Sequence, residues 1–200
     1  MLQKLPTIMG HAVSNARVGA KKLFIDDESF AAVPTRLDVR SPVFDAGDAI
    51  PPLYTVDGEK LSPPLTWVGV PPEAQSIALV VEDADSATPD PLVHALAWNF
   101  EGRDAVLVEG ELSKAGDAEP WSMMGLNSFR RPRYSPPNPP PGHGEHRYAF
   151  QVFAVDRKLD LAPGAGRTEL LHALRKHVLA KGCVVGTYER SSAAPQRGES

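Results

Sequence analysis

The sequence predicts a mainly β fold, because short strand-like segments and turn residues dominate most of its length. After Pro34 the chain consists of short apolar runs separated by Pro, Gly and Asp, and it contains 20 prolines in all. Such punctuation is typical of strands that are joined by turns. Apolar residues make up 42% of the 200 residues, which is enough for the core of one compact domain. We therefore expect a single β-rich domain.

The N-terminal segment, residues 1–36, predicts a helical extension of this domain. From Leu5 to Leu23 the apolar residues recur at spacings of three and four, and lysines and arginines occupy other parts of the helical wheel. An amphipathic helix of this kind can dock on a protein or lie on a membrane surface. Its few cations and its small, alanine-rich apolar face favour docking on the body of the protein or on a partner subunit.

The segment 76–85 predicts a central strand that ends in carboxylates. It is apolar on both sides until its acidic end, which indicates a strand buried on both faces. Because side chains alternate along a strand, Asp83 and Asp85 are expected on the same side. Two carboxylates that point the same way repel each other unless a proton, a cation or a hydrogen-bond donor lies between them. They therefore need a partner.

Two further predicted strands each begin with a histidine. Residues 94–100 begin at His94, and regular alternation places three other residues on its face: Leu96, Trp98 and Phe100. Residues 146–155 begin at His146, whose face also carries Tyr148, Phe150 and Val152. The sequence thus places titratable side chains at the ends of three apolar strands, where charge is unusual.

The C-terminal part of the chain predicts a helix, a short strand and a tail. Thr168 is placed to cap a helix, and Gly182 is expected to end it. Residues 183–188 then return as a short strand. The tail, residues 191–200, lacks the apolar residues that would stabilise an ordered structure, so we expect it to be mobile.

Composition excludes some classes of protein. The net charge is −4, and no long run of Lys or Arg is present, which argues against a nucleic-acid-binding protein. The single cysteine, Cys183, cannot form an intrachain disulfide and is expected to be a small buried residue. No apolar run approaches the length of a membrane span. These observations predict a soluble, cytoplasmic protein.

Metal binding and catalysis are two interpretations of the polar residues at the strand ends. Asp and His are acceptable ligands for zinc or iron, but His143-Gly-Glu-His146 has the wrong spacing for a helical H-E-x-x-H motif. For covalent catalysis Ser86, Ser128 and Ser135 are available, yet none lies in a G-x-S-x-G motif. His94 or His146 could act as a general base, although the sequence identifies no proton to abstract. Neither interpretation has a diagnostic motif.

The third interpretation is a binding pocket for a small anion or zwitterion. Backbone N–H groups of the turn from Gly142 to Gly144 and imidazolium side chains can both bind phosphate-like oxygens. The carboxylates fit such a pocket if they keep the histidines protonated, or if the ligand also carries an ammonium group. Taken singly, each Asp could cap a turn and each His could be a core residue. Together at strand ends they favour a pocket.

Several motifs follow one another in an order that is more specific than any one of them. They are Ser41-Pro-Val-Phe44, Leu61-Ser-Pro-Pro-Leu-Thr-Trp67, Val81-Glu-Asp-Ala-Asp85, Gly125-Leu-Asn-Ser128 and Pro139-Pro-Pro-Gly-His-Gly-Glu-His-Arg-Tyr148. In this order they resemble the phosphatidylethanolamine-binding protein family, also called the Raf kinase inhibitor protein family, and in particular its bacterial branch.

The resemblance covers residues 37–190 and implies a central antiparallel sheet packed on a second sheet, with a few peripheral helices. It also implies a small surface pocket that accepts phosphate or phosphorylated head groups. Members of the family act mainly as binding or regulatory proteins, including inhibitors of kinases and proteases, and bacterial members often look like homodimers. No general reaction goes with the pocket, and we expect no cofactor. The residues implied are Asp83, Asp85, His94, His146 and Tyr148, with Trp98, Pro139 and Gly142 as further wall residues.

The sequence departs from the family pattern at its acidic motif and at its N-terminus. The motif usually reads D-P-D-A-P, whereas here it is Asp83-Ala-Asp-Ser-Ala87, so both carboxylates remain and both prolines are absent. We therefore expect a locally different turn. Residues 1–36 have no counterpart in the minimal family pattern.

We therefore predict a non-enzymatic protein that binds a small anionic or zwitterionic ligand. His94 and His146 are expected to donate to the ligand, the two carboxylates to orient or charge them, and Tyr148 to supply a hydroxyl. His143 lies between two glycines and is expected at the rim or fully exposed. The alternatives are a metal-assisted or acid/base hydrolase that uses the same residues, and an inhibitor or scaffold whose protein partner binds near the N-terminal helix.

Overall fold

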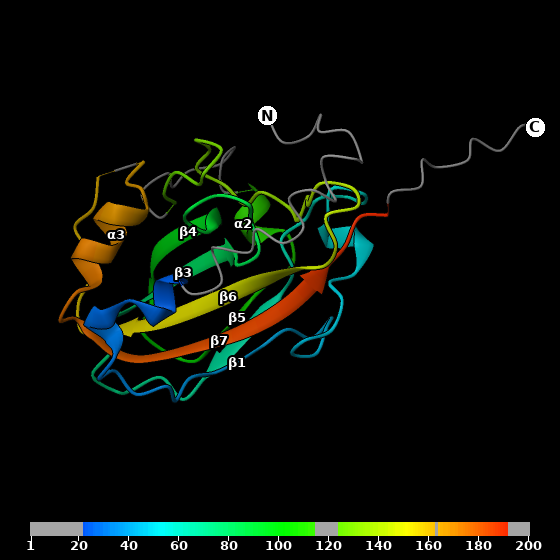
Figure 1. Ribbon diagram of the computed structural model, residues 1–200. Coiled ribbons are helices and arrows are strands. Elements are labelled where there is room, and N and C mark those ends of the chain that lie inside the picture. The colour runs from blue at the N-terminus through cyan, green and yellow to red at the C-terminus, as the bar shows by residue number, and fades with distance from the viewer. Residues whose placement is uncertain (1–21, 115–123, 163, 192–200) are drawn as a thin grey trace, which may run out of the picture.

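The computed structural model describes residues 22–114, 124–162 and 164–191, and it confirms the mainly β fold. Two antiparallel sheets are packed together, with short helices at their periphery (Figure 1). The amphipathic helix predicted between residues 5 and 23 lies almost wholly outside the described residues, as does the predicted tail. None of the helices in the described ranges has the length and the apolar character that a membrane crossing requires.

The larger sheet contains four strands, and the smaller sheet contains three. The larger sheet has the order β4 (Leu92–Glu101), β3 (Ser76–Asp83), β6 (His146–Val155) and β7 (Val178–Tyr188). The smaller sheet has the order β1 (Asp38–Arg40), β2 (Leu65–Val68) and β5 (Ala105–Leu107). The helical elements are α2 (Glu111–Lys114), α3 (Arg167–Leu174) and the 3₁₀ turns η3 (Phe24–Asp26), η4 (Glu28–Phe30) and η5 (Pro52–Tyr54).

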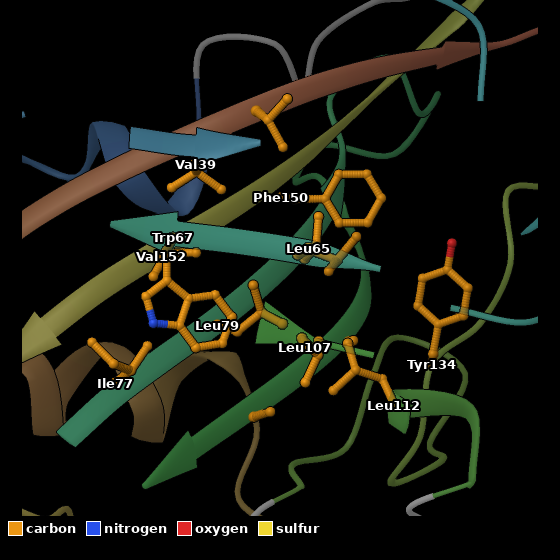
Figure 2. Packing of buried hydrophobic residues seen from close by; sticks show 14 of the residues in the cluster. Val39, Leu65, Trp67, Ile77, Leu79, Leu107, Leu112, Tyr134, Phe150 and Val152 are labelled. Atoms are coloured by element: carbon orange, nitrogen blue, oxygen red, sulfur yellow. The ribbon is translucent and has the colours of Figure 1, made fainter. Parts of the chain in front are cut away.

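Strand β3 is buried along its whole length, as its near-continuous apolar sequence predicts. On the front face, which we define as the face toward the smaller sheet, Ile77 and Leu79 join a large apolar cluster. Figure 2 shows Leu65 and Trp67 of β2 in this cluster. On the opposite, rear face, Ala78 belongs to a second cluster. A strand that packs on both faces cannot show the polar and apolar alternation of a half-exposed strand.

The rear face is covered by α3 and by residues 22–33. The rings of Phe24, Phe30 and Phe153 pack against one another there, with centroids 5.4 to 5.9 Å apart. In Figure 1 this N-terminal segment, drawn in blue, lies across β6 and β7 at the same end of the sheet as α3. The part of the N-terminal extension that the structure describes is thus docked on the body of the protein.

A buried carboxylate fastens this segment to the sheet. Glu82 of β3 is fully buried and accepts hydrogen bonds from the backbone N–H of Phe24 (2.7 Å), from Nε2 of Gln151 (3.0 Å) and from Nε of Arg167 (2.7 Å). The Gln151 side chain also accepts a bond of 2.6 Å from the backbone N–H of Ile25. A buried charge is tolerated when it is paired and hydrogen-bonded in this way.

The C-terminal helix is shorter than the sequence predicts. It ends at Leu174, and Gly182 lies within β7 instead of ending the helix. A side chain at Gly182 would place its Cβ 2.2 Å from the backbone oxygen of Leu37, so this glycine lets the chain before β1 approach the strand closely. The glycine therefore marks a close contact between backbones, which the sequence pattern does not distinguish from a helix end.

We expect Glu82→Ala to lower the free energy of unfolding by about 3 kcal/mol, because Arg167 and the backbone N–H of Phe24 lose their buried partner. Urea unfolding followed by tryptophan fluorescence measures this change. Glu101→Ala is the matched control: Glu101 pairs with Arg103 at the surface, with 73% of its side chain exposed, and should cost far less. Equal losses in the two variants would contradict the anchoring role of Glu82.

Candidate functional site

Four of the predicted residues meet at one end of the larger sheet: Asp83, His94, His146 and Tyr148. Asp83 is directly paired with Tyr148 between β3 and β6, and His146 lies two residues before Tyr148 on the same strand. Directly paired residues share a face of the sheet, as do residues two apart in one strand. All four are buried, with exposed fractions of 1 to 3%. Together with Tyr134 and His143, described below, we call them the strand-end cluster.

His94 reaches this cluster because β4 contains a bulge. Val81 pairs with Ala95 and Glu82 pairs with Val93, so that His94 is the extra residue between them. A bulge redirects the side chains on either side of it. The imidazole of His94 consequently lies edge-on to the ring of Tyr148, with 5.2 Å between the ring centroids.

The same bulge changes the position of Trp98. Regular alternation predicted that Trp98 shares the face of His94, but Trp98 and Leu96 lie in the rear cluster. A second irregularity, where Asn99 has a φ of 65°, places Phe100 against the front cluster. The prediction that Leu96 and Trp98 share one face with His94 is wrong, because the first irregularity interrupts the alternation, whereas the second returns Phe100 to the front face.

A chain of three buried side chains runs through the cluster. Nδ1 of His146 lies 2.8 Å from Oδ2 of Asp83, and Nε2 of His146 lies 2.5 Å from Nδ1 of His143. Both ring nitrogens of His146 therefore have partners. His143 is only 1% exposed, so the prediction that it lies at the rim is wrong. Positive φ values at Gly142 and Gly144 turn the chain so that His143 packs on the ring of His146.

Asp85 takes a different role from Asp83. Strand β3 ends at Asp83, and the backbone N–H of Asp85 donates back to the Asp83 carboxylate (2.9 Å). Asp85 is fully buried and accepts two bonds from the guanidinium of Arg147, of 2.8 and 2.9 Å, and one from the Arg147 backbone N–H. The hydrogen bonds to Asp85 raise the pKa of Arg147. The strand alternation that we assumed for the two carboxylates therefore stops at Asp83.

Three polar atoms of the cluster have no hydrogen-bond partner within the described part of the chain. They are Nε2 of His94 and the hydroxyl groups of Tyr134 and Tyr148; the backbone N–H of Asn138 lies near the Tyr148 oxygen, but it can only donate and so leaves the proton of that hydroxyl without an acceptor. Figure 2 shows Tyr134 beside Leu112 at the end of the front cluster, with its hydroxyl pointing away from that leucine. Buried polar atoms are rarely left unpaired in proteins, because each costs about 1–3 kcal/mol. The three atoms therefore indicate a place where something else binds.

Burial determines the charge of these groups at neutral pH. It lowers the pKa of His94, an effect that the nearby Asp83 carboxylate only partly opposes. It also raises the pKa of Tyr134, and burial together with Asp83 raises the pKa of Tyr148 well above its usual range. His94 is accordingly neutral and both phenols keep their protons.

The loop of residues 127–135 carries the features that sequence reasoning missed. Asn127 holds its shape: its side-chain oxygen accepts from the backbone N–H groups of Phe129 and Arg131, and its NH₂ group donates to the Arg133 carbonyl and the Ser135 hydroxyl. The loop binds the edge of β4, where Nδ1 of His94 lies 2.6 Å from the Ser135 carbonyl oxygen. In the sequence, the Gly125-Leu-Asn-Ser128 motif is the feature that could have indicated this loop.

This loop also brings an aromatic ring and three arginines to the site. The ring of Phe129 lies edge-on to His94 at 5.9 Å between centroids and is 48% exposed. Arg130 and Arg131 are exposed and Arg133 is half-buried, and none of the three pairs with a carboxylate in the described ranges. The loop therefore adds positive charge next to a cluster that contains a buried carboxylate.

The remaining candidates have structural contacts. The hydroxyl of Ser128 accepts from the Val93 backbone N–H, and that of Ser86 contacts Thr88. Pro139 is buried, and Gly142 donates a 3.4 Å backbone bond to the Arg190 carbonyl and directly precedes His143. Among the residues that the structure describes, no three His, Cys, Asp or Glu side chains are placed to hold a metal ion.

Comparison with sequences identifies relatives over most of this chain. The family model described as phosphatidylethanolamine-binding protein matches residues 40–189. A UPF0098 protein from Methanothermobacter thermautotrophicus is 38% identical over 154 residues, which cover 77% of this chain and 99% of the relative. A UPF0098 protein from Chlamydia pneumoniae is 38% identical over 159 residues, which cover 78% of this chain and all of the relative.

Solved structures give the same result. A putative phosphatidylethanolamine-binding protein homologue from Chlamydia trachomatis is 33% identical and superposes with a TM-score of 0.69 over 78% of this chain and 98% of its own. YbcL of E. coli, at 23% identity and the same TM-score over 78% of this chain and 99% of its own, shares the fold. The matched range begins after the segment that packs on the rear face. The chain thus belongs to the phosphatidylethanolamine-binding protein family.

Proposed function

We propose that this protein binds a small ligand that carries an oxyanion, such as a phosphate group, at the strand-end cluster, and that it acts by binding and not by turnover. The observation that carries the proposal is the set of three unpartnered buried atoms on His94, Tyr134 and Tyr148. The ring centroids of His94 on β4 and Tyr148 on β6 lie 5.2 Å apart, and Tyr134 from the loop is near enough to Tyr148 to add to the effects of burial and of Asp83 in raising the pKa of its hydroxyl. A ligand with several oxygens would supply partners for all three atoms at once.

Charge around the cluster supports an anionic ligand. The loop of residues 127–135 carries three arginines that make no ion pair with the described residues and lies against His94. An anion near such a loop gains favourable interaction energy before it reaches the buried atoms. The family name refers to a phospholipid whose head group is a phosphate ester with an ammonium group, and a zwitterion of this kind also suits the Asp83 carboxylate.

The serine contacts support binding over hydrolysis. A nucleophilic serine needs a base within hydrogen-bond reach. The hydroxyl of Ser135 instead accepts from the Asn127 side chain, and the His94 ring contacts the carbonyl of Ser135 and not its hydroxyl. The hydroxyl of Ser128 is used by the backbone of β4. These serines stabilise the loop that carries the arginines.

Ligand entry requires the cluster to open. The three unpartnered atoms are closed off from solvent. Phe129 is half exposed and lies against His94, so its ring can rotate with little loss of packing. We propose that displacement of this ring opens the cluster.

We expect Tyr148→Phe to weaken binding while it stabilises the free protein. The variant removes an unpartnered buried hydroxyl, so the free energy of unfolding should rise by about 1 kcal/mol, whereas phosphoethanolamine affinity should fall about fivefold to tenfold. Titration calorimetry and urea unfolding measure the two effects. Tyr188→Phe is the control, because that hydroxyl already donates to Asp57 outside the cluster. A variant that binds as well as the wild type would remove Tyr148 from the site.

We expect neutralising the loop to reduce both the affinity and its dependence on salt. The variant carries Arg130→Gln, Arg131→Gln and Arg133→Gln. Its loop should keep its shape, because the bonds that Asn127 makes to residues 131 and 133 involve their backbone atoms and not their side chains. Titrations with phosphoethanolamine at low and high salt measure the change, which screening predicts to be largest at low salt. An unchanged salt dependence would show that the arginines do not contribute.

We expect acid to destabilise the free protein through His94. Because burial lowers the pKa of His94 below its ordinary value of 6.5, the unfolded chain binds a proton that the folded chain does not bind over the range between the two values. The free energy of unfolding therefore falls as the pH decreases below about 6.5. His94→Asn, which can keep the bond to the Ser135 carbonyl, should show a smaller slope against pH in urea unfolding. An equal slope would assign the effect to other groups.

A further inference from the structure

The hydrogen bond between His94 and Ser135 determines what His94 can offer to a ligand. The carbonyl oxygen of Ser135 can only accept, so Nδ1 of His94 must donate across the 2.6 Å contact. Nε2 of the neutral ring is then a lone pair. This atom is the buried nitrogen that has no partner among the described residues. The open position of His94 is therefore an acceptor and not a donor.

No described side chain fills the open position at Nε2 of His94. Asp83 on β3 and His146 on β6 are the ionisable groups whose charges act on His94, and Tyr148 and Phe129 face it with their rings. Both ring nitrogens of His146 already have partners in Asp83 and His143. Within the described residues, the unpartnered atoms of the cluster are thus one nitrogen lone pair and two phenol hydroxyls.

A fully deprotonated oxyanion fits these surroundings poorly. Its oxygens only accept hydrogen bonds, so an oxygen placed at Nε2 of His94 would face another acceptor in a buried site. An oxygen that carries a proton would donate to Nε2 and make the missing bond. The other oxygens of the same group could accept from the hydroxyls of Tyr134 and Tyr148.

On the basis of the proposed function, we propose that the strand-end cluster selects the protonated form of a phosphate group, with one proton held between a ligand oxygen and Nε2 of His94. A phosphate monoester then binds as its monoanion. Where the free ester is a dianion, binding takes up one proton from solution. Sulfate has the same tetrahedral shape but carries no proton near neutral pH, so the cluster discriminates against it.

The test is calorimetric titration of the full chain with phosphoethanolamine and with sulfate across a range of pH. Each phosphate titration is repeated in two buffers of different ionisation enthalpy, which gives the number of protons taken up. Phosphate affinity should fall about tenfold per pH unit above the second pKa of the ester, which is about 6, and uptake should approach one proton. Sulfate should bind about 100-fold more weakly or worse.

Two variants locate the proton acceptor. His94→Asn can keep a donor for the Ser135 carbonyl and removes Nε2, so it should bind phosphate more weakly and lose both the proton uptake and the preference over sulfate. His172→Asn is the control, since His172 is exposed on α3, away from the cluster. It should bind as the wild type does. If His94→Asn does not fold, the proton uptake and the sulfate comparison of the wild type still test whether the cluster selects a protonated phosphate group.

The outcomes separate this proposal from the proposed function. Wild type that binds phosphate and sulfate equally, or binds phosphate with no dependence on pH, overturns the selection of a protonated ligand and leaves the anion site in place. Wild type that binds neither ligand at any pH overturns the anion site and this proposal with it.

Discussion

The acidic end of β3 is the feature on which the rest of the structure depends. Glu82 lies on the rear face and bonds to the N-terminal segment, and Asp83 lies on the front face and bonds to His146. Asp85, just beyond the strand, forms an ion pair with Arg147. His146 and Arg147 are neighbours on β6, so consecutive residues of one strand are fixed by the last carboxylate of β3 and by a carboxylate two residues beyond it. A carboxylate that faced the wrong side would be buried without a partner, which makes a one-residue shift between β3 and β6 very costly.

Much of this arrangement could be predicted from the sequence. The buried strand was recognisable from its apolar run, and pairing between strands brings together Asp83, His146 and Tyr148, whose types and order also carry the family resemblance. The features that could not be predicted each depend on one residue that departs from a regular pattern. The bulge at His94 looks like regular alternation in the sequence, and the Gly182 of β7 looks like a helix end. The conformation at each of these two residues depends on which part of the backbone lies next to it in the folded chain.

The position of His143 and the role of Asn127 were hidden for a different reason. Glycines on both sides of His143 permit a turn in either direction, and only packing on the ring of His146 determines that the side chain is buried. The four hydrogen bonds of the Asn127 side chain all go to atoms within its own loop, so it shapes the surface that carries the arginines. Local polar residues of this kind resemble ordinary turn formers in a sequence.

The three histidines of the cluster thus have separate roles that follow from their partners. Asp83 bonds to Nδ1 of His146, and Nε2 of His146 bonds to Nδ1 of His143, so the groups of this part of the cluster are partners of one another. His94 is held in one tautomer by a backbone carbonyl and is kept neutral by burial, so it alone of the three retains an unpartnered ring atom among the described residues. Neutrality at a buried position costs less than charge, and it leaves a lone pair directed at whatever binds. A cluster in which His94 were an imidazolium group would attract an anion by charge, whereas the site that we propose would distinguish ligands by the oxygen that carries a proton.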